Sequence, residues 1–202
     1  AWAILGETIM ARTSSADSDL EPRVESNWGK PQVQAPPVVT ASRKVQKIVQ
    51  ETVEGKPVSR AVEETVEDPL PLEQSRIRVD LDLEQRRKGL RWFATYRVGF
   101  AGRYLVRNST ASDQLTLRLV LPVPDAIYDD LVCNVSGTPV PIVMDNGAVV
   151  AKVRAAPGAV IPMEIGYRSQ GLESWHYSFG ENVVQVRYFR LEMRTDFDDI
   201  DF

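Results

Sequence analysis

Residues 76–83 read RIRVDLDL, with a charged side chain at every even position and an apolar one at every odd position. The apolar set is Ile77, Val79, Leu81 and Leu83. Successive side chains of a β-strand point to opposite faces of a sheet, so this alternation predicts a strand with one buried face and one face in water. Sheets of this kind close over a shared dry interior.

The same period of two recurs to near the end of the chain. Alternating apolar residues occur at 92–100, 115–121, 161–167, 175–179 and 184–188. Between 140–143 and 148–153, the Asn146-Gly147 pair predicts a tight hairpin turn. Many short strands separated by turn residues, with no helical pattern after residue 75, predict a mainly β protein. We expect an antiparallel β-sandwich over residues 75–202.

The apolar phase changes once, close to the end of the chain. Val184, Val186 and Tyr188 occupy alternate positions, but the next apolar residues begin one position later, at Phe189, and continue at 191 and 193. A single extra residue in a strand shifts the alternation in this way, so the pattern predicts a β-bulge here.

Residues 1–30 are expected to form an N-terminal helix. Apolar residues recur at helical spacing in two stripes, which are Trp2, Leu5 and Ile9, and Leu20, Val24 and Trp28. Gly29 and Pro31 then end the helix. Two interpretations remain: a helix that leaves a membrane span preceding Ala1, or an amphipathic helix packed on a soluble core.

Residues 31–74 are expected to form an extended segment followed by a protruding β-ribbon. Three prolines keep 29–42 from being helical. The stretches 45–55 and 58–68 then repeat one pattern with a shift of 13 residues. Their valine and threonine content favours strands, with a turn at Gly55. A helix–turn–helix is the alternative, because each copy also has helical spacing.

The composition limits the kinds of partner and chemistry. The 202 residues carry a net charge of −4, which argues against a general nucleic-acid binder. No apolar run approaches the roughly 20 residues that a membrane-spanning helix needs. Cys133 is the one cysteine, so no internal disulfide can form. We expect a folded domain whose thiol is a small buried side chain.

Few residues are suited to catalysis or metal binding. His176 is the one histidine, and only Cys133 could join it as a zinc ligand. The acidic end, with Asp196, Asp198, Asp199 and Asp201, lacks the glycine and distal glutamate of a calcium loop. We therefore expect no enzyme activity, no metal and no cofactor. An Asp/Glu-dependent hydrolase remains an alternative, because carboxylates from distant strands can meet in space.

Aromatic and basic residues offer two possible binding surfaces. Trp92, Trp175 and Tyr177 are the candidate binding residues for a carbohydrate or lipid headgroup. The preferred interpretation of the row 175–179 is that it fills the core. Residues 76–107 hold nine Lys/Arg against three Asp/Glu, which suits either contact with anionic lipid or, as we prefer, a solvated strand face.

Three stretches together resemble the CreD-like family of inner-membrane proteins, described as cell-envelope integrity proteins. Residues 12–38 join an arginine-bearing helix to Trp-Gly and a Pro-Gln strand entrance. Residues 70–104 run from a strand through an arginine–glycine turn to an aromatic strand, and 165–197 end in an aromatic strand and a hairpin arm. The repeat at 45–68 departs from the family pattern.

The resemblance implies a location and a class of function. A member of this family has one helix before a large β-rich periplasmic domain and several membrane helices after it. We therefore expect missing membrane spans on both sides of this chain, and a periplasmic domain of a bacterial inner-membrane protein. Its expected role is contact with an envelope protein, or self-association, in cell-envelope maintenance. The family supplies no catalytic residues.

Overall fold

The computed structural model describes residues 30–53, 56–88, 91–180 and 186–198 of the chain. All regular secondary structure in these residues is β-strand, which confirms the expectation of a mainly β protein. The predicted helix over residues 1–30 lies outside the described residues, apart from Lys30 itself. Because the described part holds no helix, it contains none that is long and apolar enough to cross a membrane.

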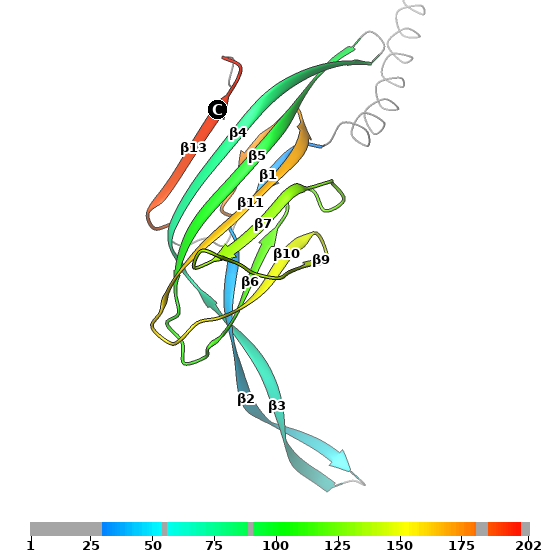
Figure 1. The fold of residues 1–202 in the computed structure, drawn as a ribbon. Coiled ribbons are helices and arrows are strands. Elements are labelled where there is room, and N and C mark those ends of the chain that lie inside the picture. Colours follow the sequence, from blue (N-terminus) through cyan, green and yellow to red (C-terminus); the bar gives the residue numbers. More distant parts are fainter. Residues whose placement is uncertain (1–29, 54–55, 89–90, 181–185, 199–202) are drawn as a thin grey trace, which may run out of the picture.

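The strands of the described residues follow one another with short connections (Figure 1). They are β1 (Gln32–Gln34), β2 (Val38–Val53), β3 (Lys56–Leu70), β4 (Leu72–Lys88), β5 (Arg91–Arg107), β6 (Gln114–Val120), β7 (Asp129–Val135), β8 (Thr138–Pro139), β9 (Ile142–Asp145), β10 (Ala148–Arg154), β11 (Val160–Leu172), β12 (Trp175–Tyr177) and β13 (Phe189–Thr195).

The strands form two large sheets and one small one. The six-stranded sheet has the order β13-β4-β5-β11-β7-β8, the five-stranded sheet has the order β3-β2-β6-β10-β9, and β1 pairs with β12. The predicted purely antiparallel arrangement is wrong at two places. β13 runs parallel to β4, and β1 runs parallel to β12, because each strand joins a partner that is distant in sequence rather than a hairpin neighbour.

Side chains from both large sheets form one buried cluster. It contains Ile77, Val79 and Leu81 of the alternating stretch 76–83. From the five-stranded sheet it contains residues of β2, β6 and β10, and from β11 it contains Ile161, Met163, Ile165 and Tyr167. Leu115, Leu117 and Leu119 are at most 3% exposed, as their alternation predicts. The apolar face of each sheet therefore supplies one interior.

Two glutamines of β1 are fully buried in this interior. Gln34 accepts a hydrogen bond from the Tyr167 hydroxyl at 2.7 Å and donates to the carbonyl of Val120 at 3.0 Å. Gln32 accepts from the Ser169 hydroxyl at 3.2 Å and donates to the carbonyl of residue 170 at 2.9 Å. Gln34 thus links β11 of one large sheet to β6 of the other.

The two turn predictions have different outcomes. Asn146 and Gly147 connect β9 to β10 with positive φ angles of 47° and 72°, which confirms the tight hairpin. The predicted bulge after Tyr188 is wrong, because residues 186–188 are not in a strand and β13 pairs with β4 in unbroken register. Tyr188 itself has a φ of 43°, so a change of chain direction explains the shift in apolar phase.

Two tyrosine rings lie over glycines on the inner face of the six-stranded sheet. A Cβ atom at Gly102 would lie 2.5 Å from the Tyr104 hydroxyl oxygen, and one at Gly171 would overlap the Tyr96 ring. Both rings are buried. The glycines therefore leave the space that these rings fill.

We expect Gly171→Ala to destabilise the protein by about 2 kcal/mol or more, because the new methyl group must displace the buried Tyr96 ring. The measurement is the urea midpoint of unfolding followed by circular dichroism. Gly99→Ala is the matched control, since its nearest non-neighbouring atom would be 3.8 Å away. Equal midpoints for the two variants would contradict the packing described.

Alkaline pH should also destabilise the fold. Burial raises the pKa of Tyr96, Tyr104 and Tyr167, because the phenolate would lose its hydration. In the unfolded chain tyrosine ionises near pH 10, so above that pH the unfolded state holds fewer protons than the folded one. We expect the free energy of unfolding to fall as the pH rises above about 10. Denaturant titrations at several alkaline pH values test this, and Tyr104→Phe should weaken the dependence.

Candidate functional site

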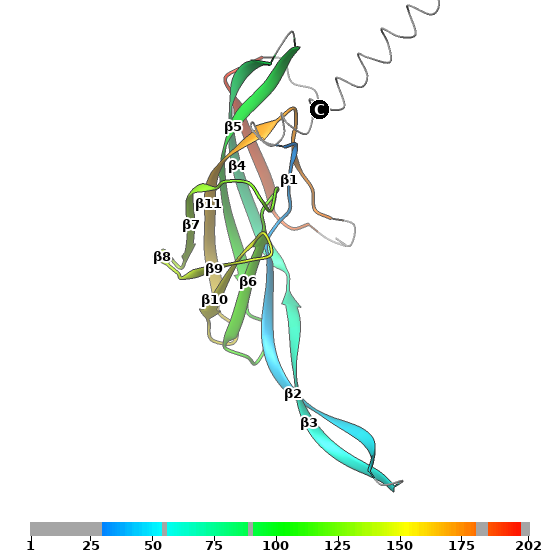
Figure 2. The ribbon, with the colours of Figure 1, turned by 90° about the vertical axis from the view of Figure 1, so that its right-hand side faces the viewer.

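A two-stranded ribbon formed by β2 and β3 extends beyond the body of the protein (Figures 1 and 2). Its pairs run without interruption from Val39↔Leu70 to Val53↔Lys56. This confirms the predicted β-ribbon and removes the helix–turn–helix alternative. Ala41 and Leu70 are its last buried residues, and the described side chains at 42–50 and 59–69 are exposed or half-buried. Most of the ribbon thus lies outside the shared core.

The sequence repeat gives the ribbon two different faces. Within residues 42–50 and 59–69, one face carries four valines, which are Val45, Val49, Val62 and Val66. The register pairs odd-numbered residues of β2 with even-numbered residues of β3, and paired residues share a face. Because the repeat shift of 13 is an odd number, repeated positions lie on the same face. We call these four residues the valine face. Each valine is opposite a charged or long polar partner: Val45 pairs with Glu64, for example. Within the same two ranges, the other face is polar apart from Ile48, Ala61 and Pro69.

Ion pairs connect the two ribbon strands on both faces. Lys47 and Glu64 lie 3.2 Å apart on the valine face, and Lys44 and Glu63 lie 3.1 Å apart on the polar face. All four side chains are at least half exposed, and such pairs contribute about 1 kcal/mol at most. A two-stranded ribbon is marginally stable on its own. The ribbon therefore has apolar surface and hydrogen-bonding edges that the body does not cover.

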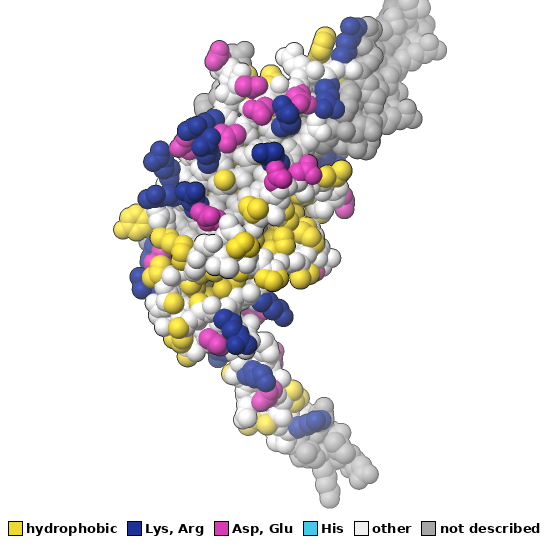
Figure 3. Space-filling view, viewed as in Figure 1, with side chains coloured by type: hydrophobic (Ala, Val, Ile, Leu, Met, Phe, Trp, Pro, Cys, Tyr) yellow, Lys and Arg dark blue, Asp and Glu magenta, His cyan; other side chains and the backbone are white. Residues whose placement is uncertain are grey.

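The outer face of the six-stranded sheet carries a row of three arginines. Arg190 of β13 is directly opposite Arg76 of β4, which is directly opposite Arg103 of β5. We call these three residues the arginine row. Like charges at opposite positions on adjacent strands destabilise a sheet. Figure 3 shows Lys and Arg side chains gathered over β13 and β4.

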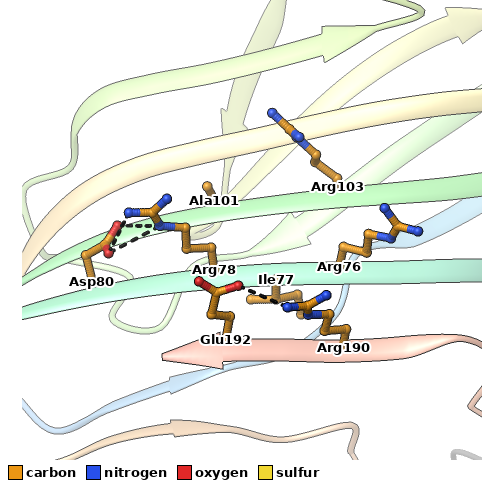
Figure 4. Close-up of a pocket in the computed structure, with 8 residues that line it drawn as sticks. All are labelled: Arg76, Ile77, Arg78, Asp80, Ala101, Arg103, Arg190 and Glu192. Atoms are coloured by element: carbon orange, nitrogen blue, oxygen red, sulfur yellow. Dashed lines mark hydrogen bonds and ion pairs between the residues drawn. The ribbon is translucent and has the colours of Figure 1, made fainter. Parts of the chain in front are cut away.

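A shallow hollow of about 510 Å³ lies beside the arginine row (Figure 4). Ala101 lies on β5 two residues before Arg103 and is opposite Arg78. Its small side chain leaves the hollow between the longer side chains around it. Its lining residues are Arg76, Ile77, Arg78, Asp80, Ala101, Arg103, Arg190 and Glu192.

The arginines of the hollow differ in how they are paired. Arg78 makes hydrogen bonds of 3.1–3.3 Å to Asp80, and this contact raises the pKa of the Arg78 guanidinium. Arg190 reaches Glu192 only at 3.5 Å. Among the described residues no carboxylate pairs with Arg76. Its guanidinium donates hydrogen bonds to the side-chain amide oxygen of Gln74. Two members of the arginine row therefore have weak neutralisation or none.

A second, larger hollow of about 1030 Å³ lies further along the same face and is rich in carboxylates. Asp80, Asp82, Glu84, Asp129 and Asp130 contribute to its lining. Glu84 pairs with Arg97 at 3.1 Å, and Asp130 pairs with Arg168 at 3.1 Å. The outer face is thus positive beside the arginine row and more negative toward the far end.

The structure separates the three aromatic residues that the sequence suggested for binding. Trp175 is buried at 8% exposure and Tyr177 is half-buried, with ring centroids 6.5 Å apart. Trp92 is 64% exposed and lies on β5, with the guanidinium carbon of Arg87 at 5.9 Å from its ring centre. Trp92 belongs to the alternating set at 92–100, but it lies on a part of β5 outside the shared core. The three rings do not form one exposed platform.

The other candidate residues have simple surroundings. His176 is exposed on β12. Cys133 is buried, and loss of hydration raises the pKa of its thiol. Asp196 accepts a hydrogen bond from the backbone N–H of Leu83 at 2.8 Å, whereas Asp199 and Asp201 lie outside the described residues. Within the described part, no group of three or more His, Cys, Asp or Glu residues could hold a metal ion.

Comparisons with protein-family models, with curated proteins and with solved structures find no match to this chain. The sequence indicated the basic character of residues 76–107, but only the strand register shows that three of the arginines of this face form one row.

We expect Arg76→Gln to stabilise the fold by about 0.5 kcal/mol at low salt, because it removes the middle charge of the arginine row. The gain should shrink in about 1 M salt, where charges are screened beyond about 3 Å. The measurement is the denaturant midpoint at both salt concentrations. Arg97→Gln, which removes a cation paired with Glu84, is the control and should not stabilise. A loss of stability for Arg76→Gln at low salt would contradict the repulsion.

Proposed function

We propose that this chain is a non-enzymatic contact domain that uses its ribbon to bind a protein partner. The body is then a β-sandwich whose two sheets share one interior, and its role is to hold the ribbon away from its own surface. The single observation behind this proposal is the valine face, whose apolar residues are regularly spaced and have no core to pack against.

The valine face suits a protein surface better than a small ligand. Its valines alternate with charged side chains such as Lys47 and Glu64 along the described part of each ribbon strand. A partner side chain can pack between diagonal valines while its polar groups meet the neighbouring charges. An apolar strand face without this alternation of charges would also be an aggregation hazard. The pattern therefore favours a specific contact.

The proposed location is the periplasmic side of a bacterial inner membrane, with a role in maintaining the cell envelope. The support is the resemblance of residues 12–38, 70–104 and 165–197 to the CreD-like family. No family model matches the chain, so the proposal rests on this resemblance alone. The partner is then an envelope protein or a second copy of this chain. The proposal includes attachment to the membrane by flanking helices, which the resemblance implies.

The two alternative functions have less support. A carbohydrate- or lipid-binding platform requires at least two exposed, coplanar rings, but Trp175 is buried and Tyr177 is half-buried. A hydrolase requires a pair of carboxylates in a cleft. The acidic hollow brings several together, but Glu84 and Asp130 are held by arginines at its surface. Neither alternative explains the ribbon.

Photo-crosslinking in cells that make the full-length protein tests the ribbon directly. A photoreactive side chain at Val49 faces out from the valine face, and one at Gln50 faces out from the polar face of the same strand. We expect a discrete adduct from position 49 and none from position 50. An adduct with twice the mass of the protein identifies a second copy as the partner. Equal labelling from both positions would contradict a face-specific contact.

We also expect the triple variant Val45→Ser/Val49→Ser/Val62→Ser to lose the adduct formed by a photoreactive group at Val66 while the body keeps its thermal midpoint. The midpoint should be unchanged because none of these valines belongs to the shared core. The matched control is Gln46→Ser/Gln50→Ser/Thr65→Ser on the polar face, which should keep the adduct. A large drop in the midpoint for the valine variant would show that the ribbon stabilises the body.

A further inference from the structure

We propose that the hollow beside the arginine row binds a phosphate group carried by a small molecule or a lipid headgroup. This inference concerns the outer face of the six-stranded sheet and is independent of the ribbon. It starts from the cross-strand register, which places Arg190, Arg76 and Arg103 directly opposite one another on three adjacent strands.

The arginine row is electrostatically unfavourable. Neighbouring strands lie about 4.8 Å apart, so three guanidinium groups start from backbones that together span only about 10 Å. Sheets usually place opposite charges or uncharged residues at such positions. The positions two residues further along the same three strands follow this rule. There Glu192 is opposite Arg78, and Arg78 is opposite Ala101. A bound anion would relieve the repulsion that the arginine row creates.

The hollow has more cationic than anionic side chains in its lining, so its net charge favours an anion. Four arginines and two carboxylates line it. Arg78 is fully engaged by Asp80, but Arg190 is 3.5 Å from Glu192, which is longer than an ordinary charge-assisted hydrogen bond. Arg103 pairs with Glu164 at 3.0 Å outside the hollow, and its side chain is 75% exposed. Arg76 donates to the amide oxygen of Gln74, and it is the one arginine of the row that no carboxylate of the described residues neutralises.

A phosphate group fits this set better than a carboxylate. Its charge at neutral pH is about −1.5 to −2, and its oxygens can accept paired hydrogen bonds from several planar guanidinium forks at once. A carboxylate has one charge and two oxygens, which suits a single arginine. A phosphate group therefore suits the charge of the arginine row better than a carboxylate does.

The surroundings limit the size of the anionic ligand. The neighbouring acidic hollow contributes Asp82, Glu84, Asp129 and Asp130 to the same face, and the whole chain has a net charge of −4. A long polyanion such as a nucleic acid would cross this negative region and be repelled. A single phosphate on a neutral carrier touches only the positive end. Free phosphate esters and phosphate-bearing lipid headgroups share this chemistry.

Titration of the protein with glycerol 3-phosphate, followed by NMR of the arginine Nε–H groups, tests the site. We expect saturable shifts of Arg76, Arg103 and Arg190. Arg76→Gln/Arg103→Gln should weaken binding by about tenfold or more, which corresponds to about 1.4 kcal/mol. The matched charge control is Arg97→Gln, on the same strand as Arg103, which should change the affinity less than about twofold.

A steric variant separates a built site from general attraction to a positive surface. Ala101→Leu fills the hollow without changing any charge, and Ala101 is exposed, so the fold should tolerate it. We expect it to weaken binding as strongly as the double arginine variant. Ala94→Leu, at another exposed position of β5, is its control. Unchanged binding in Ala101→Leu would overturn the proposal.

Vesicle sedimentation then distinguishes the two sources of phosphate. Phosphatidylcholine vesicles with phosphatidic acid, which has a phosphate monoester headgroup, are compared with vesicles of phosphatidylcholine alone. Sedimentation that requires phosphatidic acid and is lost in Ala101→Leu assigns the site to a lipid headgroup. Binding of glycerol 3-phosphate without such sedimentation assigns it to a soluble ester. The proposal is overturned if neither probe binds saturably, or if Arg97→Gln weakens binding as much as the double variant does.

Discussion

The contact on which this fold most depends is the pair of hydrogen bonds made by the buried side chain of Gln34. One bond reaches Tyr167 on the six-stranded sheet and the other reaches Val120 on the five-stranded sheet. The amide also donates to the neighbouring carbonyl of Ala35 at 2.6 Å. A buried polar group that loses a partner costs about 1–3 kcal/mol, so a spacing of the two sheets that keeps both inter-sheet bonds is favoured. Apolar packing alone tolerates small shifts, whereas this amide does not.

Fixing the sheets in this way also fixes the direction of the ribbon. β1 leads into β2, which pairs with β6 only at Val38 to Ala41 before it continues with β3 alone (Figure 2). The base of the ribbon is therefore anchored in the core, while its outer part pairs with no other strand of the described residues. A protein with this arrangement can present the valine face at a distance from its body without changing its own packing.

The outer face of the six-stranded sheet has a separate organisation. Its long charged side chains come from alternate positions of β13, β4, β5 and β11. The small residues Ala101 and Gly99 line the two hollows between them. The inner positions of the same strands are filled by Ile77, Val79 and the tyrosine rings over glycine. The strict alternation of a strand thus lets one stretch of sequence build the core and, on its other side, a charged surface.

The amino-acid sequence by itself determined the strands, the core positions and the ribbon, because these depend on local alternation and on turn residues such as Asn146-Gly147. The N-terminal extended segment gave no local sign that Gln32 and Gln34 would be buried. Only the tertiary structure decided this, together with the parallel placement of β13, the exposure of Trp92 and the arginine row. Each of these depends on which distant strands become neighbours and in which register, and a period of two contains no information about partners.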